Sequence, residues 1–430
     1  MSLTSRILIA MALGLVVGAM FNIVESQGWL AGVYDSWIDR FLVDGLFDLG
    51  GKIFVALLKL LVVPLVFVSL VCGVASLGDN TRMGPMAGKT LVLYMITTAV
   101  AISLALLAGV LVQPGSGFNL TTEVNFVAAE APSLKEVLLG MVPTNPVQAM
   151  AEGNMLQIIV FALLVGIAVS KSGDAGKRIA SFFNDFNEII LRMVVILMNF
   201  APYGVFCLIA QLAADLGLDA FSNLLQYFFT VLFVLLLHGL GTYALALKAL
   251  TGLSPLMFYR KMKSVALFAF SMSSSNATIP VTLKAVRDEL GADNRVASFT
   301  VPMGATINMD GTAIMQGVAT AFIAQAYNID IGIGGYMMVI LTATLASIGT
   351  AGVPGVGLIM LSMVLQQVGL PVEGIALIIG VDRLLDMTRT AVNVCGDAMV
   401  TLAVAKSEGM LDEQRFNEDP NMLPARKTEA

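Results

Sequence analysis

Long apolar segments separated by short polar loops fill the first 250 residues of the chain. Because a helix rises about 1.5 Å per residue, roughly 20 apolar residues cross a hydrocarbon core about 30 Å thick. The pattern predicts six transmembrane helices, at 7–24, 46–77, 90–112, 155–170, 183–213 and 223–249. The first segment lacks a small-residue cleavage site after its apolar run, so we expect a retained span rather than a signal peptide.

The apolar runs within 255–405 are short and are broken by Ser, Gly, Asn and Pro. Backbone groups at such breaks are tolerated at membrane depth only where protein or a water-filled cavity covers them. Two segments, 255–290 and 333–368, each consist of an apolar run, a small polar break with proline and a second apolar run. A longer, polar-interrupted span follows each of them, at 296–327 and 372–405. We therefore predict an inverted repeat in which a hairpin and then a broken helix occur twice, the pattern that places a transporter's binding site near the membrane midplane.

The fold predicted from these segments is an all-α polytopic membrane protein with eight transmembrane helices and two re-entrant helical hairpins. Composition agrees, since 57% of residues are hydrophobic and 13% charged, against about 25% charged in soluble domains. This excludes a simple soluble enzyme and a disordered chain. The formal net charge of −6 and the lack of a basic block argue against nucleic-acid binding. Basic residues concentrate in alternate loops, which predicts that both termini are cytoplasmic, and the compact external loops favour a prokaryotic cell (inner) membrane.

One polar stripe carries most of the charge in the last span. Asp382, Asp386, Arg389, Asn393 and Asp397 are spaced 4, 3, 4 and 4 residues apart, so on a helix they fall within roughly 80° of arc. Each ionised residue at the bilayer centre costs about 2.5–3.5 kcal/mol, and four of them about 10–14 kcal/mol. We therefore expect this face to look inward rather than toward lipid.

The charges of the stripe do not balance, because it holds three carboxylates and one arginine. One interpretation is a buried salt-bridge network that locks the helices together, but an unpaired buried charge is strongly destabilising. Arg383, about 100° away from the stripe on the helix, can serve one carboxylate. Cations or the ammonium group of a ligand can serve the others.

Further polar groups lie in other predicted spans. Asp310 stands beside Gly311, which loosens the helix and exposes carbonyls, and oxygen ligands of this kind suit a hard cation. Tyr94, Thr97 and Thr98 lie on adjacent turns, either as ordinary helix contacts or as cation ligands. The small-residue tips at 273–278 and 349–357 allow a ligand to approach the backbone closely.

Four other residues have ordinary interpretations. We expect His238 to be satisfied within its own helix rather than to act as a proton relay. Cys72, Cys207 and Cys395 lie far apart in apolar stretches and without metal-binding spacing, so we expect inert packing residues.

The motifs SSSNATIP, NMDGT, SIGTAGVPG and DMTRTAVNVCGD, in this order, resemble the glutamate transporter family, the sodium:dicarboxylate symporters. The resemblance covers nearly the whole chain. It implies a homotrimer in which each subunit moves a transport domain against a static scaffold like an elevator, with the second hairpin as extracellular gate. The implied divisions are scaffold helices at 1–77 and 124–213, the latter with the trimer contacts, transport-domain helices at 89–112 and 223–250, a transport core at 255–405 and a cytoplasmic tail at 406–430.

The resemblance also assigns roles to residues of the site. Arg389 would hold the side-chain carboxylate of the substrate in a planar fork that lysine cannot supply. Asp386 and Thr390 would take the amino group. The other implied substrate contacts are Asn393, Ser274 and Ser275 for the α-carboxylate, and Thr312 with the backbone of Val353 and Gly357 around the distal carboxylate.

Several sodium ions, carried as co-substrates, are implied in three sets of ligands. The sets are Gly304, Asn308, Asn393 and Asp397; the carbonyls of Ser347, Ile348 and Thr350 with Thr306; and Tyr94, Thr97, Thr98, Asn308 and Asp310. One departure concerns a second arginine that family members usually carry, since the corresponding positions here hold Ser273 and Met387. Arg383, one turn before Met387, is the candidate replacement.

These features predict a sodium-coupled symporter of L-aspartate and L-glutamate, which is not an enzyme. A proton-coupled glutamate or C4-dicarboxylate carrier is the nearest alternative, although the retained Asn308, Asp310 and Asp397 argue against it. An intramembrane aspartyl protease using Asp310 and Asp397 conflicts with the arginine on the same stripe, which keeps carboxylates ionised. A ligand-gated anion channel is a further alternative.

Overall fold

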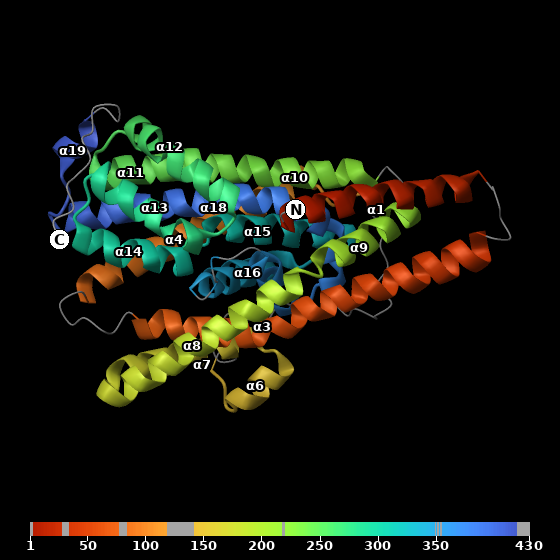
Figure 1. Cartoon of the computed structure of the whole chain (residues 1–430), viewed down its shortest axis with the longest axis horizontal. Coiled ribbons are helices and arrows are strands. Elements are labelled where there is room, and N and C mark those ends of the chain that lie inside the picture. The colour runs from red at the N-terminus through yellow and green to blue at the C-terminus, as the bar shows by residue number, and fades with distance from the viewer. Residues whose placement is uncertain are drawn as a thin grey trace.

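The computed structural model of the chain describes residues 3–27, 34–76, 84–117, 142–216, 220–348, 350, 352 and 355–418. Within these ranges the chain is helical, apart from one isolated antiparallel bridge between Ala292 and Leu411. Most helices run along the long axis of the molecule (Figure 1). In chain order the elements are α1 (Leu3–Ser26), η1 (Tyr34–Phe47), α3 (Asp48–Ser76), α4 (Gly84–Val112), α6 (Pro146–Glu152), α7 (Met155–Lys171), α8 (Gly173–Met198), α9 (Ala201–Leu216), α10 (Ala220–Leu236), η2 (Leu237–Thr242), α11 (Tyr243–Thr251), α12 (Pro255–Met272), α13 (Ser275–Asp288), α14 (Asn294–Ile307), α15 (Asp310–Ala326), α16 (Gly332–Ser347), α17 (Val356–Gln367), η3 (Val372–Gly374), α18 (Ile375–Ser407) and α19 (Glu413–Asn417).

Among the described residues, four helices are long and apolar enough to cross a membrane. They are Ser5–Ser26, Asp39–Ala75, Pro85–Val112 and Asn223–Thr251, which match four of the predicted spans. The predicted span at 183–213 is wrong as one helix, because α8 and α9 meet at a 47° bend. Pro202 lies at the start of α9; proline lacks an N–H and clashes with the carbonyl four residues earlier, which ends α8. If the bent pair is one span, the number rises to five.

Both predicted hairpins form as helix, break and helix. The first break, between α12 and α13, contains Ser273 in the left-handed region at φ +50°. Ser274 then caps α13, because its Oγ accepts a hydrogen bond from the Ala277 N–H at 3.3 Å. The second hairpin places Gly355, at φ +86°, immediately before α17, where a residue with a Cβ would be strained.

The two polar-interrupted spans differ from each other. The first breaks at Asn308 and Met309, between α14 and α15, as NMDGT predicts. The prediction of a second broken helix is wrong, because α18 is continuous for 33 residues. Its charged side chains pair along one face at helical spacing, so they support the helix instead of interrupting it. A helix, a break and a second helix therefore occur twice, whereas of the two spans that follow, the first is interrupted and the second is continuous.

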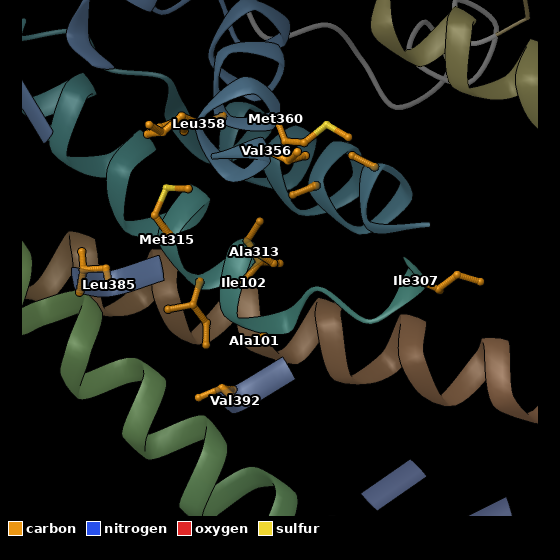
Figure 2. Packing of buried hydrophobic residues seen from close by; sticks show 14 of the residues in the cluster. Ala101, Ile102, Ile307, Ala313, Met315, Val356, Leu358, Met360, Leu385 and Val392 are labelled. Carbon is orange, nitrogen blue, oxygen red and sulfur yellow. The ribbon is translucent and has the colours of Figure 1, made fainter. Parts of the chain in front are cut away.

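Packing is densest within two groups of helices, which are joined by contacts of α3 with α17 and of α9 with α18. In the first group, α1 packs on α9, and α3 packs on α7, α8 and α9. In the second group, α18 is covered by α10, α11, α12, α14 and α15, while α4 packs along α15. Side chains from α4, α15, α17 and α18 meet in the apolar core (Figure 2). All residues of α15 except Gln325 are buried, so the ends of α15 and the middle of α18 position the polar site inside the protein.

Candidate functional site

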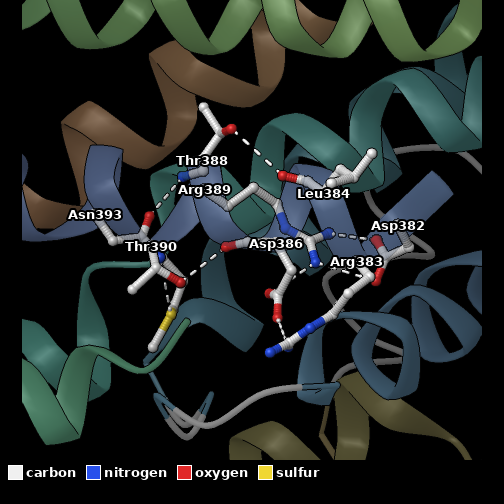
Figure 3. A network of polar contacts seen from close by, with 10 residues as sticks. Asp382, Arg383, Leu384, Asp386, Thr388, Arg389, Thr390 and Asn393 are labelled. Carbon is white, nitrogen blue, oxygen red and sulfur yellow. Dashed lines mark hydrogen bonds and ion pairs between the residues drawn. The ribbon is translucent and has the colours of Figure 1, made fainter. Parts of the chain in front are cut away.

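Four charged side chains of α18 form one ion-pair network (Figure 3). Arg389 Nη1 lies 2.9 Å from Asp382 Oδ1, and Arg389 Nη2 lies 2.9 Å from Asp386 Oδ1. Arg383 Nη1 lies 3.2 Å from the other oxygen of Asp386. The side chain of Arg389 is only 1% exposed. The prediction that Arg383 pairs with one carboxylate of the stripe is therefore confirmed.

Two glycines allow the backbone of neighbouring helices to lie close to Arg389, one at its guanidinium group and the other at its main-chain carbonyl. A Cβ at Gly357, in α17, would lie 3.3 Å from Arg389 Nη2, and a Cβ at Gly311 would lie 2.7 Å from the Arg389 carbonyl oxygen. The first turn of α17, in the second hairpin, and the first turn of α15 therefore both lie against Arg389. Asn393, one turn later, accepts a hydrogen bond through Oδ1 from the Gly311 N–H at 2.7 Å.

The charge balance of the stripe is thus different from the one its sequence suggested. Asp382 and Asp386 face two arginines, Arg383 and Arg389, so this end of the stripe is neutral and forms a salt-bridge network. The imbalance lies deeper, at Asp397 and at Asp310, which are 2% and 0% exposed. Among the described residues, His238 is the one basic side chain within ion-pair distance of either carboxylate.

The first predicted sodium set comes together around Asp397. Asn308 donates from Nδ2 to Asp397 Oδ1 at 2.8 Å and to the Asn393 carbonyl at 2.9 Å. Its carbonyl oxygen Oδ1 is buried, and no described residue donates a hydrogen bond to it, which leaves an acceptor that a cation can use. A Cβ at Gly304 would lie 2.3 Å from Asp397 Oδ1 and 2.5 Å from the Tyr94 hydroxyl. These two oxygens therefore converge on the bare backbone of Gly304.

The third predicted set is brought together only in part. Thr98 donates to Asp310 Oδ1 at 2.6 Å, and Tyr94 donates to the Thr300 carbonyl at 3.1 Å. Thr97 bonds to the Tyr94 carbonyl of its own helix at 3.1 Å, so its hydroxyl makes an ordinary helix contact. Asp310 also accepts a hydrogen bond from the Tyr243 hydroxyl at 2.8 Å.

The second predicted set borders a polar cavity of about 370 Å³. Thr306 of α14 and Thr350 contribute to its wall, together with Ser69 of α3 and Asn187 of α8. Ser347 and Ile348 are buried at the end of α16, 3% and 6% exposed. Thr350 and the Ser347 carbonyl are linked by a 3.3 Å hydrogen bond from the Thr350 N–H.

The tips of the two hairpins meet each other. Ser274 Oγ donates to the Gly352 carbonyl at 2.7 Å, and the Asn276 N–H donates to the same oxygen at 3.3 Å. Ser275 is packed beside this contact, since its Cβ would lie 3.0 Å from a Cβ at Gly352. The first-hairpin serines are thus at the junction of the tips, and Val353 lies outside the described residues.

The remaining predicted substrate residues are buried next to the network. Thr312 lies in the first turn of α15 and is 7% exposed. Thr390 is 5% exposed and donates its hydroxyl to the Asp386 carbonyl at 2.9 Å.

Sequence reasoning missed the partners of Asp310 on the helix formed by α10, η2 and α11. His238 Nε2 lies 3.1 Å from Asp310 Oδ2, and the imidazole and the carboxylate are both 0% exposed. The prediction that His238 is satisfied within its own helix is therefore wrong: its partner is on another helix, and its Nδ1 has no hydrogen-bond partner. Cys395 is buried and, like Cys72 and Cys207, free. A histidine within an apolar span was the available signal.

The helical arrangement with its buried charged centre agrees with comparison to known proteins. The family model described as "Sodium:dicarboxylate symporter family" matches residues 3–407. The chain belongs to this family. It is a transporter rather than an enzyme, which removes the aspartyl protease interpretation. With its several apolar helices, a member of this family is a multi-pass integral membrane protein.

Named relatives cover almost the full chain. A "Proton/glutamate-aspartate symporter" from Escherichia coli (strain K12) is 35% identical, over 96% of this chain and 94% of the relative. A "Proton/sodium-glutamate symport protein" from Bacillus caldotenax is 33% identical over 95% of each chain. A "C4-dicarboxylate transport protein" from Rhodospirillum rubrum is 34% identical over 85% of this chain and 83% of the relative. The names agree on symport and differ on the coupling ion and the substrate.

Proposed function

We propose that this protein is a secondary transporter that carries acidic amino acids, L-aspartate or L-glutamate, together with sodium ions. The observation that carries the proposal is the division of charge along α18. One end holds a neutral network around Arg389, and the other holds Asp397 next to Asp310 in a fully buried, oxygen-rich setting. The first end has the chemistry to bind a carboxylate, and the second to bind a cation.

Arg389 can exchange partners within its network. Its two terminal nitrogens contact Asp382 and Asp386, which are carboxylates on its own helix. A substrate carboxylate offers the same fork geometry, so it can replace an internal carboxylate at Arg389 with little change in local charge. The displaced Asp386 still has Arg383 as a partner, and it can also face a substrate ammonium group.

The deeper end needs positive charge. A buried charge that loses its partner costs about 3–5 kcal/mol, because it is left uncompensated. Among the described residues, the Asp397 carboxylate accepts one hydrogen bond, from the neutral amide of Asn308, so its charge has no compensating partner there. The free Asn308 carbonyl oxygen and the Tyr94 hydroxyl supply neutral oxygen atoms beside it. Carboxylate, carbonyl and hydroxyl oxygens suit a hard cation such as sodium.

The mechanism that we propose is an elevator. The helices α4 and α10 to α18 would form a mobile transport domain with both hairpins re-entering the membrane, and α1, α3 and α7 to α9 a static scaffold within a homotrimer. Eight spans, both termini in the cytoplasm and a prokaryotic inner membrane complete the proposal. The two packing groups support it, as does the cavity that α3 and α8 line together with α14 and the hairpin residues Asn276 and Thr350.

Calorimetric titration tests substrate and ion together. Aspartate, glutamate and succinate are titrated into the purified protein at several sodium concentrations, with choline keeping the ionic strength constant. We expect aspartate and glutamate to bind more tightly as sodium rises. Equal affinity at all sodium concentrations contradicts sodium coupling and favours the proton-coupled alternative, while tighter binding of succinate favours a C4-dicarboxylate carrier.

A further inference from the structure

A π-helical turn in the helix that runs from α10 to α11 carries the imidazole that contacts Asp310. This turn, η2, has the sequence LHGLGT and contains two glycines. The π-helix is rare; it occurs mostly as single turns inside α-helices, and these are frequently found at functional sites. Here Gly239 packs on Val392 of α18, since a Cβ at Gly239 would lie 3.2 Å from Val392 Cγ2, and its carbonyl accepts a hydrogen bond from the Tyr259 hydroxyl. The turn is thus fixed between α12 and α18.

His238 and Tyr243 contact the same oxygen of Asp310. His238 Nε2 is 3.1 Å and the Tyr243 hydroxyl 2.8 Å from Asp310 Oδ2. Opposite an ionised Asp310, which only accepts hydrogen bonds, both groups would be donors and the tautomer with the proton on Nε2 is the one that fits. The two rings pack edge to face with centroids 4.6 Å apart. This arrangement fixes the direction of both donors.

The other oxygen of Asp310 points to the predicted cation ligands. Asp310 Oδ1 accepts from Thr98 at 2.6 Å. The Tyr243 hydroxyl also approaches the amide of Asn308, since a Cβ at Gly396 would lie 2.4 Å from the hydroxyl and 2.6 Å from Asn308 Nδ2. Asp310 is therefore held at Oδ2 by η2 and α11 and at Oδ1 by Thr98, a predicted cation ligand, and Asn308 lies near the Tyr243 hydroxyl.

We propose that His238 is a positioning residue for cation binding, whose Nε2–H holds Asp310 Oδ2 so that Oδ1 stays directed toward Thr98 and the cation ligands. This inference rests on the proposed sodium coupling and adds a residue that does not itself contact the ion. In metal sites, the groups that orient a ligand typically change metal affinity 10- to 100-fold when they are mutated. Burying a nitrogen without a hydrogen bond costs free energy, and no described residue bonds to the Nδ1 of His238. A side chain kept only for packing would not need buried polar nitrogens, so their presence agrees with a role for the Nε2 contact.

The test compares two substitutions that separate hydrogen bonding from packing. His238→Phe keeps a ring but removes the donor, and His238→Gln keeps a donor on a side chain without a ring. Thr230→Val, on α10, is the matched control, because the Thr230 hydroxyl bonds to the Gln226 carbonyl of its own helix at 2.7 Å. All are measured as the full-length purified protein at one pH.

Two readouts are recorded. The first is the sodium concentration that gives half-maximal aspartate binding, and the second is the rise in Tm with sodium in the absence of aspartate. We expect His238→Phe to raise the half-maximal sodium concentration about 10- to 100-fold, with aspartate affinity at saturating sodium changed less than about threefold. His238→Gln should recover most of the loss, and Thr230→Val should match the wild type.

The outcomes separate this inference from the proposed function. Unchanged sodium dependence in His238→Phe, or equal impairment by Phe and Gln, overturns the role of His238. Aspartate binding that does not depend on sodium in the wild type overturns the proposed coupling itself. If His238→Phe does not fold, Tyr243→Phe removes the second donor to the same oxygen: a smaller shift in the same direction supports the proposal, and no shift contradicts it.

Discussion

Replacing Gly304 with alanine places a methyl group directly in the region where we place a cation. A Cβ at Gly304 would lie 2.3 Å from Asp397 Oδ1, 2.5 Å from the Tyr94 hydroxyl and 2.6 Å from Asp397 Cγ. Ordinary contacts of a Cβ begin near 3.4 Å, so the carboxylate must move by about an ångström. Asp397 and Tyr94 are 2% and 0% exposed, which leaves little room for that movement.

The magnitude follows from overpacking. Extra methyl groups in a tightly packed interior typically cost about 1–3 kcal/mol. Because the displaced carboxylate is the proposed ligand, we expect the loss to appear in cation binding. At about 1.4 kcal/mol per tenfold change, the half-maximal sodium concentration for aspartate binding should rise roughly 5- to 150-fold.

The assay is calorimetric titration of aspartate at several sodium concentrations, with Gly88→Ala as the matched control. Gly88 also lies in a helix, α4, and no atom of the described residues lies within 4 Å of the position that its Cβ would take. Alanine there should be neutral or slightly stabilising, by about 0.5–1 kcal/mol. If Gly304→Ala folds and binds aspartate with wild-type sodium dependence, Asp397 is not a cation ligand and our reasoning fails.

Three further variants test other parts of the site. Arg389→Thr should weaken aspartate binding at least tenfold, since hydrogen bonds to charged groups contribute about 1.5–3 kcal/mol, while neutral amino acids still bind; unchanged aspartate affinity in titration would refute the role of the guanidinium. Arg383→Ala removes one of the two arginines that neutralise Asp386. The affinity for succinate should therefore fall roughly tenfold, about 1.4 kcal/mol, and the affinity for aspartate should fall less. Equal losses in a competition assay would contradict this. Phe416→Ala should lower Tm, because this fully buried ring lies 5.7 Å from the Lys261 ammonium and loss of a core Phe costs about 3–5 kcal/mol; an unchanged Tm would show that α19 contributes nothing to stability.

Apolar length and local breakers made most of the fold predictable. Apolar stretches located the helices, and the small polar breaks located both hairpin tips. NMDGT located the interruption before Asp310. The bend at the end of α8 was available in principle, because Pro202 marks it, but its surroundings are so apolar that the segment resembled one span.

The site was predictable where one helix carried it and unpredictable where several helices met. The stripe on α18 follows from spacing alone. The pairing of Arg383 with one carboxylate of the same helix was likewise predicted, because Asp386 lies only three residues away. The contact between His238 and Asp310 joins residues that lie 72 positions apart, and periodicity says nothing about which helices pack together.

Uptake into proteoliposomes is the most direct test of the central claim that the buried carboxylates of this protein couple substrate movement to sodium. Radiolabelled L-aspartate is supplied outside vesicles at equal internal and external pH, with or without an inward sodium gradient. Our account predicts concentrative uptake with the sodium gradient and none without it. Accumulation that ignores sodium and follows an imposed proton gradient would contradict it.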